Sequence, residues 1–459
     1  MEVPGARGYR QLGHSRWRLH VIMLVLACGA LWAPSGAAAR GNPLAGRAMW
    51  VWELPASGDG SVSQIIATAH RYGIGTLMIK SSDGTSLWSQ FNAPLVAQLH
   101  AAGIHVCAWQ YVYGTHPVTE AYMGAYAVRD GADCLVIDAE SEYEGKYISA
   151  QTYIRRLRTL IGYGYPLALA GFPYVDYHPA FPYSVFLGPG GAQYNAPQMY
   201  WRDIGVTTDT VFAHTYAFNL PYQRPIFPLG QVFQNPPANQ IVRFRQLSRA
   251  YGAPGVSWWD WQEAGSSDWT AISRPAGTLP GYVPYRIMAD VGRGAQGDMV
   301  VWAQEHLISA GYPIAVSGDF GYHTLVDVEA FQSAHGLTAD GIIGAQTWAS
   351  LLRYRDARVN WVAHPPSGGQ QAVLATAAHG LRRQARTAAA SSAGVTIVAP
   401  VPRSASRPAK RDEIAGAGGA GRPPAVVTTR ARAPLPARSS SAHRRPGSRL
   451  RGHGRRHGT

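Results

Sequence analysis

Eight short apolar runs recur between residues 49 and 262, and amphipathic stretches separate most of them. A solid apolar run is typical of a strand buried on both faces, and apolar residues three and four apart are typical of a helix packed on a sheet. The alternation predicts an α/β fold, a (β/α)8 barrel, over residues 41–272. The predicted strands are 49–54, 76–80, 105–113, 134–140, 166–172, 197–201, 225–232 and 255–262, and the clearest predicted helices are 61–72, 93–102, 118–129, 149–161 and 239–251.

A doubly wound open sheet is the alternative arrangement for the same alternation. Such a sheet usually carries a glycine-rich phosphate loop after its first strand. No such loop follows residues 49–54, so the closed barrel is the preferred prediction.

A different pattern begins after a Pro-containing linker at residues 273–288. Apolar residues and Gln304 return at helical spacing, and the pattern Gly-x-x-Thr then recurs 23 residues apart, ending at Thr324 and Thr347. Glycine tolerates the tight turn, and each threonine hydroxyl is expected to cap free amides of the helix that follows. The two similar junctions predict a small three-helix domain over residues 289–353.

This second domain resembles the three-helix peptidoglycan-binding domains found at the ends of wall hydrolases. The shared positions are Val301, Gln304, Leu307, Gly311, Tyr312, Asp319, Phe320, Gly321, Thr324, Phe331, Gln332, Gly336, Leu337, Asp340, Gly341, Gly344, Thr347 and Trp348. The chain departs from the family at Ser317, where an Asp usually precedes the glycine. The resemblance implies peptidoglycan as the partner. Its contacts would lie near the two loops, and the candidates are Asp319, Tyr322, Gln332 and Asp340.

The excess of positive charge belongs to one end of the chain. The formal net charge is +14, but residues 366–459 hold 17 Lys and Arg against two acids, whereas residues 40–365 hold 20 against 24. The same end contains no aromatic residue and is rich in Ala, Arg, Pro, Ser and Gly, which predicts a disordered tail. Anionic wall polymers are its expected partner, and a plain flexible spacer is the alternative. Nucleic acid is not expected, because aromatic residues do not interleave the basic ones.

Residues 1–39 have the form of an export signal. Four Arg precede an apolar run of 13 residues, 21–33, and Ala37 to Ala39 offer a cleavage site. A bilayer needs about 20 apolar residues, so no stable membrane span is expected. The prediction is a secreted, wall-associated protein, and a lipid-anchored Cys28 is the alternative.

Cys107 and Cys134 remain once such a signal is removed. Two cysteines in an exported protein can pair. Both lie inside apolar strand-like runs, and buried free thiols are expected, with a disulfide as the alternative.

Two carboxylates mark the predicted fourth strand. Asp138 and Glu140 are two residues apart, so they share one face of the strand at its carboxyl end, where barrels collect function. Such a pair can divide its pKa values and leave one acid protonated near neutral pH. Glu53 and Asp260, at the ends of the first and eighth strands, are candidate companions. A solvated acidic loop or a metal site is the alternative, because further acids follow Glu140.

Side chains suited to sugars recur at the other predicted strand ends. Aromatic rings stack on sugar faces, amides bond to hydroxyls, and a cation can hold a neighbouring carboxylate ionised. The candidate substrate contacts are Lys80, Trp109, Gln110, Gln198, Tyr200, Trp201, Gln231 and Trp259. Core packing is the alternative for about half of the aromatic residues near strand ends.

The Asp-x-Glu of the fourth strand resembles that of secreted lysozyme-type muramidases and their glycoside-hydrolase-like relatives. The resemblance implies Glu140 as the acid and Asp138 as the carboxylate that assists the substrate's acetamido group or stabilises charge. The chain departs from the family at Glu53, where an Asp is usual, and around Gln198 on the sixth strand. No cofactor is expected. The two function hypotheses are an enzyme that hydrolyses wall glycan and a binding or scaffolding protein on the same fold.

Overall fold

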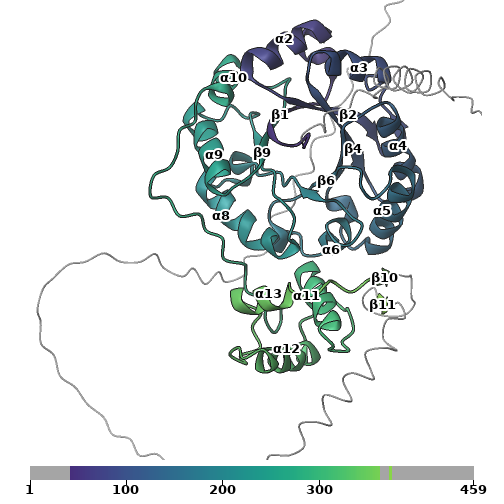
Figure 1. Ribbon diagram of the computed structural model, residues 1–459, viewed down its shortest axis with the longest axis vertical. Coiled ribbons are helices and arrows are strands. Elements are labelled where there is room, and N and C mark those ends of the chain that lie inside the picture. The colour runs from purple at the N-terminus through teal and green to yellow at the C-terminus, as the bar shows by residue number, and fades with distance from the viewer. Residues whose placement is uncertain (1–41, 362–371, 375–459) are drawn as a thin grey trace, which may run out of the picture. The chain divides into compact units, whose positions relative to one another are not determined.

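The computed structural model describes residues 42–361 and 372–374. Eight parallel strands curl into a barrel, and helices surround it (Figure 1). The strands are β1 (Gly46–Val51), β2 (Thr76–Asp83), β4 (His105–Val112), β5 (Cys134–Ala139), β6 (Leu167–Ala170), β7 (Tyr194–Asn195), β8 (Leu229–Gln231) and β9 (Gly255–Trp259). Neighbours pair in chain order, and β9 pairs with β1. The predicted (β/α)8 barrel is therefore confirmed.

The seam between β7 and β8 is the weakest part of the ring. Isolated parallel bridges join Asn195 to Ile226 and Gln198 to Leu229. The sixth strand was expected at 197–201, but the regular pairing stops at Asn195. Pro197 has no amide hydrogen and cannot continue the ladder, which accounts for the short strand.

Helices pack on the outside of the strands at most crossovers. They are α2 (Val62–Tyr72), α3 (Ala93–Ala101), α4 (Pro117–Arg129), α5 (Tyr147–Ile161), α6 (Tyr183–Phe186), α7 (Trp201–Ile204), α8 (Thr208–Asn219), α9 (Ala238–Ala250) and α10 (Ser266–Ser273). Ser61, Asn92 and Thr207 start three of them by accepting hydrogen bonds from backbone amides of the first turn. These caps satisfy amides that have no partner inside the helix.

The barrel interior is filled by two kinds of residue. Large rings such as Trp50, Trp109 and Phe227 meet the small side chains of Ala168 and Ala170, all buried in one cluster. Large and small residues on facing strands fill the tapering space, so the interior is a packed core.

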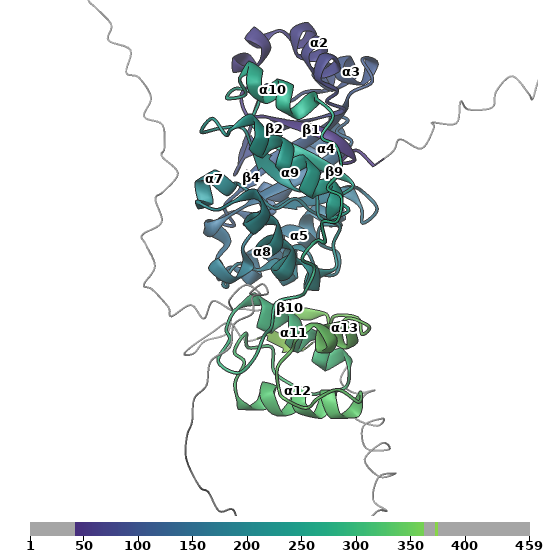
Figure 2. The ribbon, with the colours of Figure 1, turned by 90° about the vertical axis from the view of Figure 1, so that its left-hand side faces the viewer.

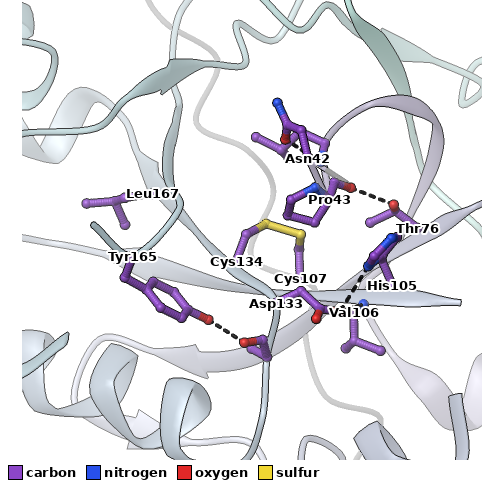
Figure 3. The surroundings of a disulfide bond; sticks show 12 residues. Asn42, Pro43, Thr76, His105, Val106, Cys107, Asp133, Cys134, Tyr165 and Leu167 are labelled. Atoms are coloured by element: carbon purple, nitrogen blue, oxygen red, sulfur yellow. Dashed lines mark hydrogen bonds and ion pairs between the residues drawn. A yellow bond between two sulfur atoms is a disulfide. The ribbon is translucent and has the colours of Figure 1, made fainter. Parts of the chain in front are cut away.

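A disulfide links Cys107 to Cys134 inside this core (Figure 3). The expected free thiols were wrong. The two residues are direct partners in the register of β4 and β5, and their side chains point to the same inner face, 4.6 Å apart at Cα. The parallel pairing itself therefore brings the two sulfur atoms together.

A second group of helices forms a small module after the barrel. Its helices are α11 (Asp298–Ser309), α12 (Tyr322–Ala334) and α13 (Ala345–Leu351), and they lie beside one another (Figure 2). Phe331 and Trp348 are buried between them. The three-helix prediction is confirmed for this segment.

Helix α11 is also joined to the barrel through Asp298. This carboxylate is fully buried and accepts hydrogen bonds from Tyr147 Oη at 2.9 Å, Ser184 Oγ and N at 2.7 Å, and Tyr222 Oη at 2.8 Å. The Trp302 indole donates to the Pro221 carbonyl at 2.8 Å. A buried acid with a full set of donors fixes the geometry of the groups around it.

The predicted export signal, 1–39, lies outside the described residues, as does the predicted tail except for β11 (Ala372–Leu374), which pairs with β10 (Val359–Trp361). Within the described part, no helix has both the length and the apolar character needed to cross a bilayer.

Candidate active site at the barrel mouth

Asp138 and Glu140 come together at the carboxyl end of β5. Alternation along the strand puts Asp138 on the inner face with Cys134 and Val136, and Glu140 follows just beyond the last strand residue. Asp138 is buried, and Glu140 is partly exposed at the mouth. The predicted pair therefore lies on one side, at the open end of the barrel.

Gln198 connects the two acids. Its side-chain nitrogen donates to Asp138 Oδ1 and to Glu140 Oε1, at 3.0 Å each. An amide nitrogen carries two hydrogens at a fixed angle, so one side chain orients both carboxyl groups.

Burial disfavours the charged forms of this pair. Desolvation and the neighbouring Glu140 raise the pKa of Asp138 well above its ordinary value. Desolvation also raises the pKa of Glu140, while the hydrogen bond from Gln198 lowers it. Neither carboxyl group therefore ionises as readily as one in water.

Lys80 stands beside the pair and was expected to contact it. Its ammonium group instead forms an ion pair with Asp83 at 2.7 Å. It also lies 4.4 Å from the Trp88 ring centre and 4.8 Å from that of Trp109. The Lys80 charge still acts on Asp138, whose pKa it lowers. The cation therefore belongs to the site through its field and not through a direct bond.

Indole rings line the floor and rim of the mouth. Trp109 and Trp259 pack edge to face at 5.3 Å, and Trp52 stacks on Trp259 at 6.5 Å. Trp52 and Trp259 are partly exposed, whereas Trp109 is buried. Exposed indole faces at a strand end suit sugar rings, and Trp109 supports them from below.

Two tyrosines complete the rim. Tyr111 donates to Glu142 at 2.8 Å, and burial raises its pKa, with Glu140 the next cause. Tyr200 is half-buried, and its pKa is raised by burial and then by Asp138, Glu140 and Asp260. Both phenols therefore stay protonated, with the Tyr111 proton engaged by Glu142.

The two expected companion acids differ from each other. Asp260 is buried at the end of β9, and burial raises its pKa to about 7. Its carboxylate accepts the Glu263 amide at 3.4 Å. Glu53 is exposed just after β1. Asp138, Glu140 and Asp260 all raise the pKa of Tyr200, which places Asp260 near the acid pair. No contact joins Glu53 to the pair.

Three expected sugar contacts point elsewhere. Gln110 faces outward on β4 and donates to the Glu120 carbonyl of α4 at 3.0 Å. Trp201 is buried in α7 and donates to Gln240 at 2.9 Å. Gln231 is fully buried and accepts the Arg202 amide at 2.8 Å. Strand alternation explains Gln110, because its neighbours Trp109 and Tyr111 take the inner face.

Sequence reasoning missed the acid and phenol that flank the Lys80 side of the mouth. Tyr113 donates to Asp83 Oδ1 at 2.8 Å, and Asp83 Oδ2 binds Lys80. The signal was available, because Asp83 lies three residues after Lys80 on an unusually long strand. Glu142 was read only as part of a solvated loop, but it binds Tyr111.

Two buried glutamines organise the loops of the helical module. Gln304 donates to Thr324 Oγ1 at 3.1 Å and accepts the Gly318 amide at 3.0 Å. Gln332 repeats this with Thr347 at 3.0 Å and the Gly341 amide at 2.9 Å. Gln332 is buried, so it holds the loop and does not face a ligand.

The two threonines do not cap their helices as expected. Thr324 donates to the Asp319 carbonyl at 3.2 Å and Thr347 to the Ile342 carbonyl at 3.4 Å. Neither helix start has a side-chain cap bond. The buried glutamine orients each hydroxyl toward the loop, and the amides of the first turn are left for other partners.

The other expected module contacts are on the surface. Asp319 and Asp340 are exposed, and Tyr322 is 65% exposed. Val326, one helical turn beyond Tyr322, and Ile342 are also exposed. These exposed apolar and acidic residues lie in the two loops and in the first turns of α12.

No group of three or more His, Cys, Asp or Glu side chains in the described ranges is arranged to hold a metal ion. The site at the mouth is therefore described by its carboxyl, amide, ammonium and aromatic groups.

Residues 296–351 match the family model of a putative peptidoglycan binding domain. The module is thus of the peptidoglycan-binding type. A zinc D-Ala-D-Ala carboxypeptidase of Streptomyces albus G is 35% identical over 91 residues, which are 19% of this chain and 34% of that protein. The chain thus spans about a third of the length of this curated relative.

Solved structures similar to the barrel have low identity to it. A chitinase from Chromobacterium violaceum is 12% identical with a TM-score of 0.37, over 50% of this chain and 98% of that one. The catalytic domain of a mannanase from a Streptomyces species is 15% identical with a TM-score of 0.39, over 51% and 86%. Identity at this level says nothing about the chemistry of this chain, and the barrel is established by its own strand order.

Proposed function

We propose that this protein is an exported wall hydrolase that binds peptidoglycan with its helical module and cleaves wall glycan at the barrel mouth. The observation that carries the proposal is the bridge from one Gln198 amide to both Asp138 and Glu140. Here one donor orients two acids whose pKa values are both raised.

Glu140 is the group suited to donate a proton. It is partly exposed, so it can reach a glycosidic oxygen, and burial raises its pKa, which favours the protonated form that a general acid needs. The bond from Gln198 to Oε1 leaves Oε2 as the oxygen available to donate a proton. General acid catalysis of this kind contributes about 10²- to 10⁴-fold in rate.

Asp138 is suited to the opposite task. It is the deeper acid, and it stabilises the positive charge that develops on the sugar or orients an acetamido group that attacks in its place.

Aromatic and phenolic groups supply the substrate platform. Trp52 and Trp259 offer exposed indole faces at the mouth. Tyr200 keeps its proton and donates to a sugar oxygen near the acids, whereas Tyr111 donates to Glu142 and accepts from a sugar hydroxyl. Such contacts hold the sugar in a fixed position relative to Glu140, and holding reacting groups in the right geometry lowers the barrier to reaction.

The module supplies affinity for the wall. Its exposed face combines Tyr322, Val326 and Ile342 with the carboxylates of Asp319 and Asp340. Apolar side chains with a polar rim suit a polymer that presents both sugar faces and amide groups. Gln304 and Gln332 hold the two loops in place beneath this face.

The test uses the whole exported protein and its Glu140→Gln variant on purified peptidoglycan. Release of reducing ends is measured alongside sedimentation of the protein with the wall. The proposal predicts that both proteins sediment and that only the parent releases reducing ends. Release by neither protein, with both still bound, would leave a wall-binding protein on a barrel without this activity.

A further inference from the structure

A second cavity lies away from the barrel mouth. It has a volume of about 300 Å³ and is lined by α5, by residues 184–190 and by residues 357–361, with Glu305 of α11 at its wall. This volume is at the lower end of the range for small-molecule sites, roughly 300–1,000 Å³. The barrel, the module and the segment after the module all contribute to it.

Three guanidinium groups face this space. Arg155 and Arg158 come from α5 and Arg358 from the segment after the module. Arg158 is buried, and its hydrogen bonds all go to neutral oxygens. These acceptors are the carbonyls of Gly162, Tyr165, Gly190 and Gly191 and the side-chain oxygen of Gln193.

The other two arginines keep free donors. Arg155 donates one hydrogen bond, from Nη1 to the side-chain oxygen of Asn360 at 2.9 Å. The Arg358 side chain makes no hydrogen bond to any described residue. Asp356 lies near Arg224 and Arg358, which lower its pKa, although burial raises it more. Asp356 is thus a single carboxyl group near two arginines. The cavity lining itself has three arginines and one acid, Glu305, so it carries an excess of positive charge.

Glu305 is the unusual member of the lining. It is 4% exposed, and within residues 42–361 nothing donates a hydrogen bond to its carboxyl group. Burial and the nearby Asp298 and Asp356 raise its pKa well above its ordinary value. The carboxyl group lies at the wall of the cavity, so a bound molecule can supply the hydrogen-bond donor that the protein does not.

We propose that this cavity binds a small anion, with its carboxylate or phosphate held between Arg155 and Arg358 and with Glu305 bonded to a hydroxyl or amide of the same molecule. Planar guanidinium groups match both oxyanions. Tyr163, which is 69% exposed, and the buried Trp361 line the cavity and provide apolar surface for the rest of the ligand. The site does not depend on the activity proposed for the barrel.

The test is calorimetric titration of the whole protein with two probes, inorganic phosphate and N-acetyl-D-alanyl-D-alanine. We expect saturable binding of at least one probe, weakened about ten-fold by Arg155→Gln and by Arg358→Gln, in line with the loss of one charge-assisted bond each. Arg71→Gln, on α2 and outside the lining, is the matched control and leaves the affinity unchanged. Phosphate alone binding identifies a phosphorylated ligand, and the dipeptide alone binding identifies a peptide carboxylate.

The acid is tested separately. Glu305→Gln keeps a hydrogen-bonding group and retains most of the affinity for a probe that carries an amide, whereas Glu305→Leu loses it. No saturable binding of either probe, or equal affinity in the Arg155, Arg358 and Arg71 variants, would overturn the site. Peptidoglycan cleavage, assayed on the same proteins, stays unchanged throughout, so failure here is distinct from failure of the barrel chemistry.

Discussion

Two buried aspartates of this protein have opposite surroundings. Asp298, at the junction of α11 and the barrel, accepts four hydrogen bonds from Tyr147, Ser184 and Tyr222. Asp138, at the barrel mouth, accepts one, from an amide that it shares with Glu140. Burial raises the pKa of Asp298 only to about 6, whereas that of Asp138 lies well above its ordinary value.

The number of hydrogen-bond donors around each aspartate distinguishes a structural acid from a candidate catalytic one. A carboxylate with donors on both oxygens is satisfied where it stands, and its charge organises the groups around it. A carboxylate that shares one donor with a second acid has lone pairs without a donor, so the loss of water around its charge is not offset. Such strain is common where a protein trades stability for activity. Burial alone would not have distinguished the two residues.

The largest expected effect comes from Asp138→Asn. We predict that turnover of peptidoglycan falls about 100-fold or more, because the charge that stabilises the transition state is removed. The melting temperature stays the same or rises, because a poorly solvated acid is also removed. Turnover and thermal unfolding are measured on the same samples, with Asp130→Asn at the end of α4 as the control. A large fall in melting temperature would mean that Asp138 is structural.

Asp298→Ala should show the reverse. Three hydroxyl groups and one amide lose their acceptor, and we expect about 3 kcal/mol of destabilisation from these unpaired groups. Chemical denaturation measures it, and turnover of the folded protein stays within about three-fold, because the mouth is untouched. Asp319→Ala, an exposed acid of the same module, changes stability by no more than about 0.5 kcal/mol.

The pH dependence of stability sharpens the same contrast. The folded pKa of Asp298 is about 6 against an ordinary 3.8, so between these values the folded protein holds a proton that the unfolded chain has released. Its contribution is full below about pH 4 and is lost as the pH rises through about 6. The stability of the parent relative to Asp298→Asn should therefore fall by about 2–3 kcal/mol from pH 4 to pH 7. A constant difference across this range would contradict the assignment.

The smallest effect is expected from Gln198→Leu. The hydrogen bond from Gln198 lowers the pKa of Glu140, so its loss raises that pKa and keeps the acid protonated to higher pH. The alkaline limb of the pH profile of kcat/KM should move upward, with about a ten-fold loss of rate from poorer orientation of the pair. Gln64→Leu on the surface of α2 is the control. A profile that keeps its limb while losing rate would leave Gln198 a merely structural residue.

Much of the fold could be predicted from periodicity. Solid apolar runs alternating with helices are a direct consequence of burying a parallel sheet on both faces, and they predicted the barrel. The short β7 could not be predicted well, because Pro197 interrupts the ladder without changing the apolar pattern. The disulfide could not be predicted either, since only the register of β4 against β5 puts Cys107 beside Cys134.

The prediction of site residues was right where the alternation of inward and outward strand positions was considered, and wrong where it was not. Asp138, Glu140, Gln198 and Tyr200 meet because inward positions at strand ends converge. Gln110 was taken as a sugar contact for its chemistry alone, although its neighbours already occupied the inner face. In the module, Gln332 fitted both a ligand contact and a loop support, and only the bonds to Thr347 and Gly341 distinguish these roles.

The most direct measurement of the central claim is digestion of purified peptidoglycan in water enriched in oxygen-18, followed by mass spectrometry of the fragments. A glycosidase leaves the water-derived oxygen on each new reducing end. We predict labelled reducing termini with the parent protein and none with Glu140→Gln. The amount of label should be largest at pH values where Glu140 is protonated. Fragments without the label, or no fragments from a parent protein that is folded and bound to the wall, would contradict hydrolysis at the barrel mouth.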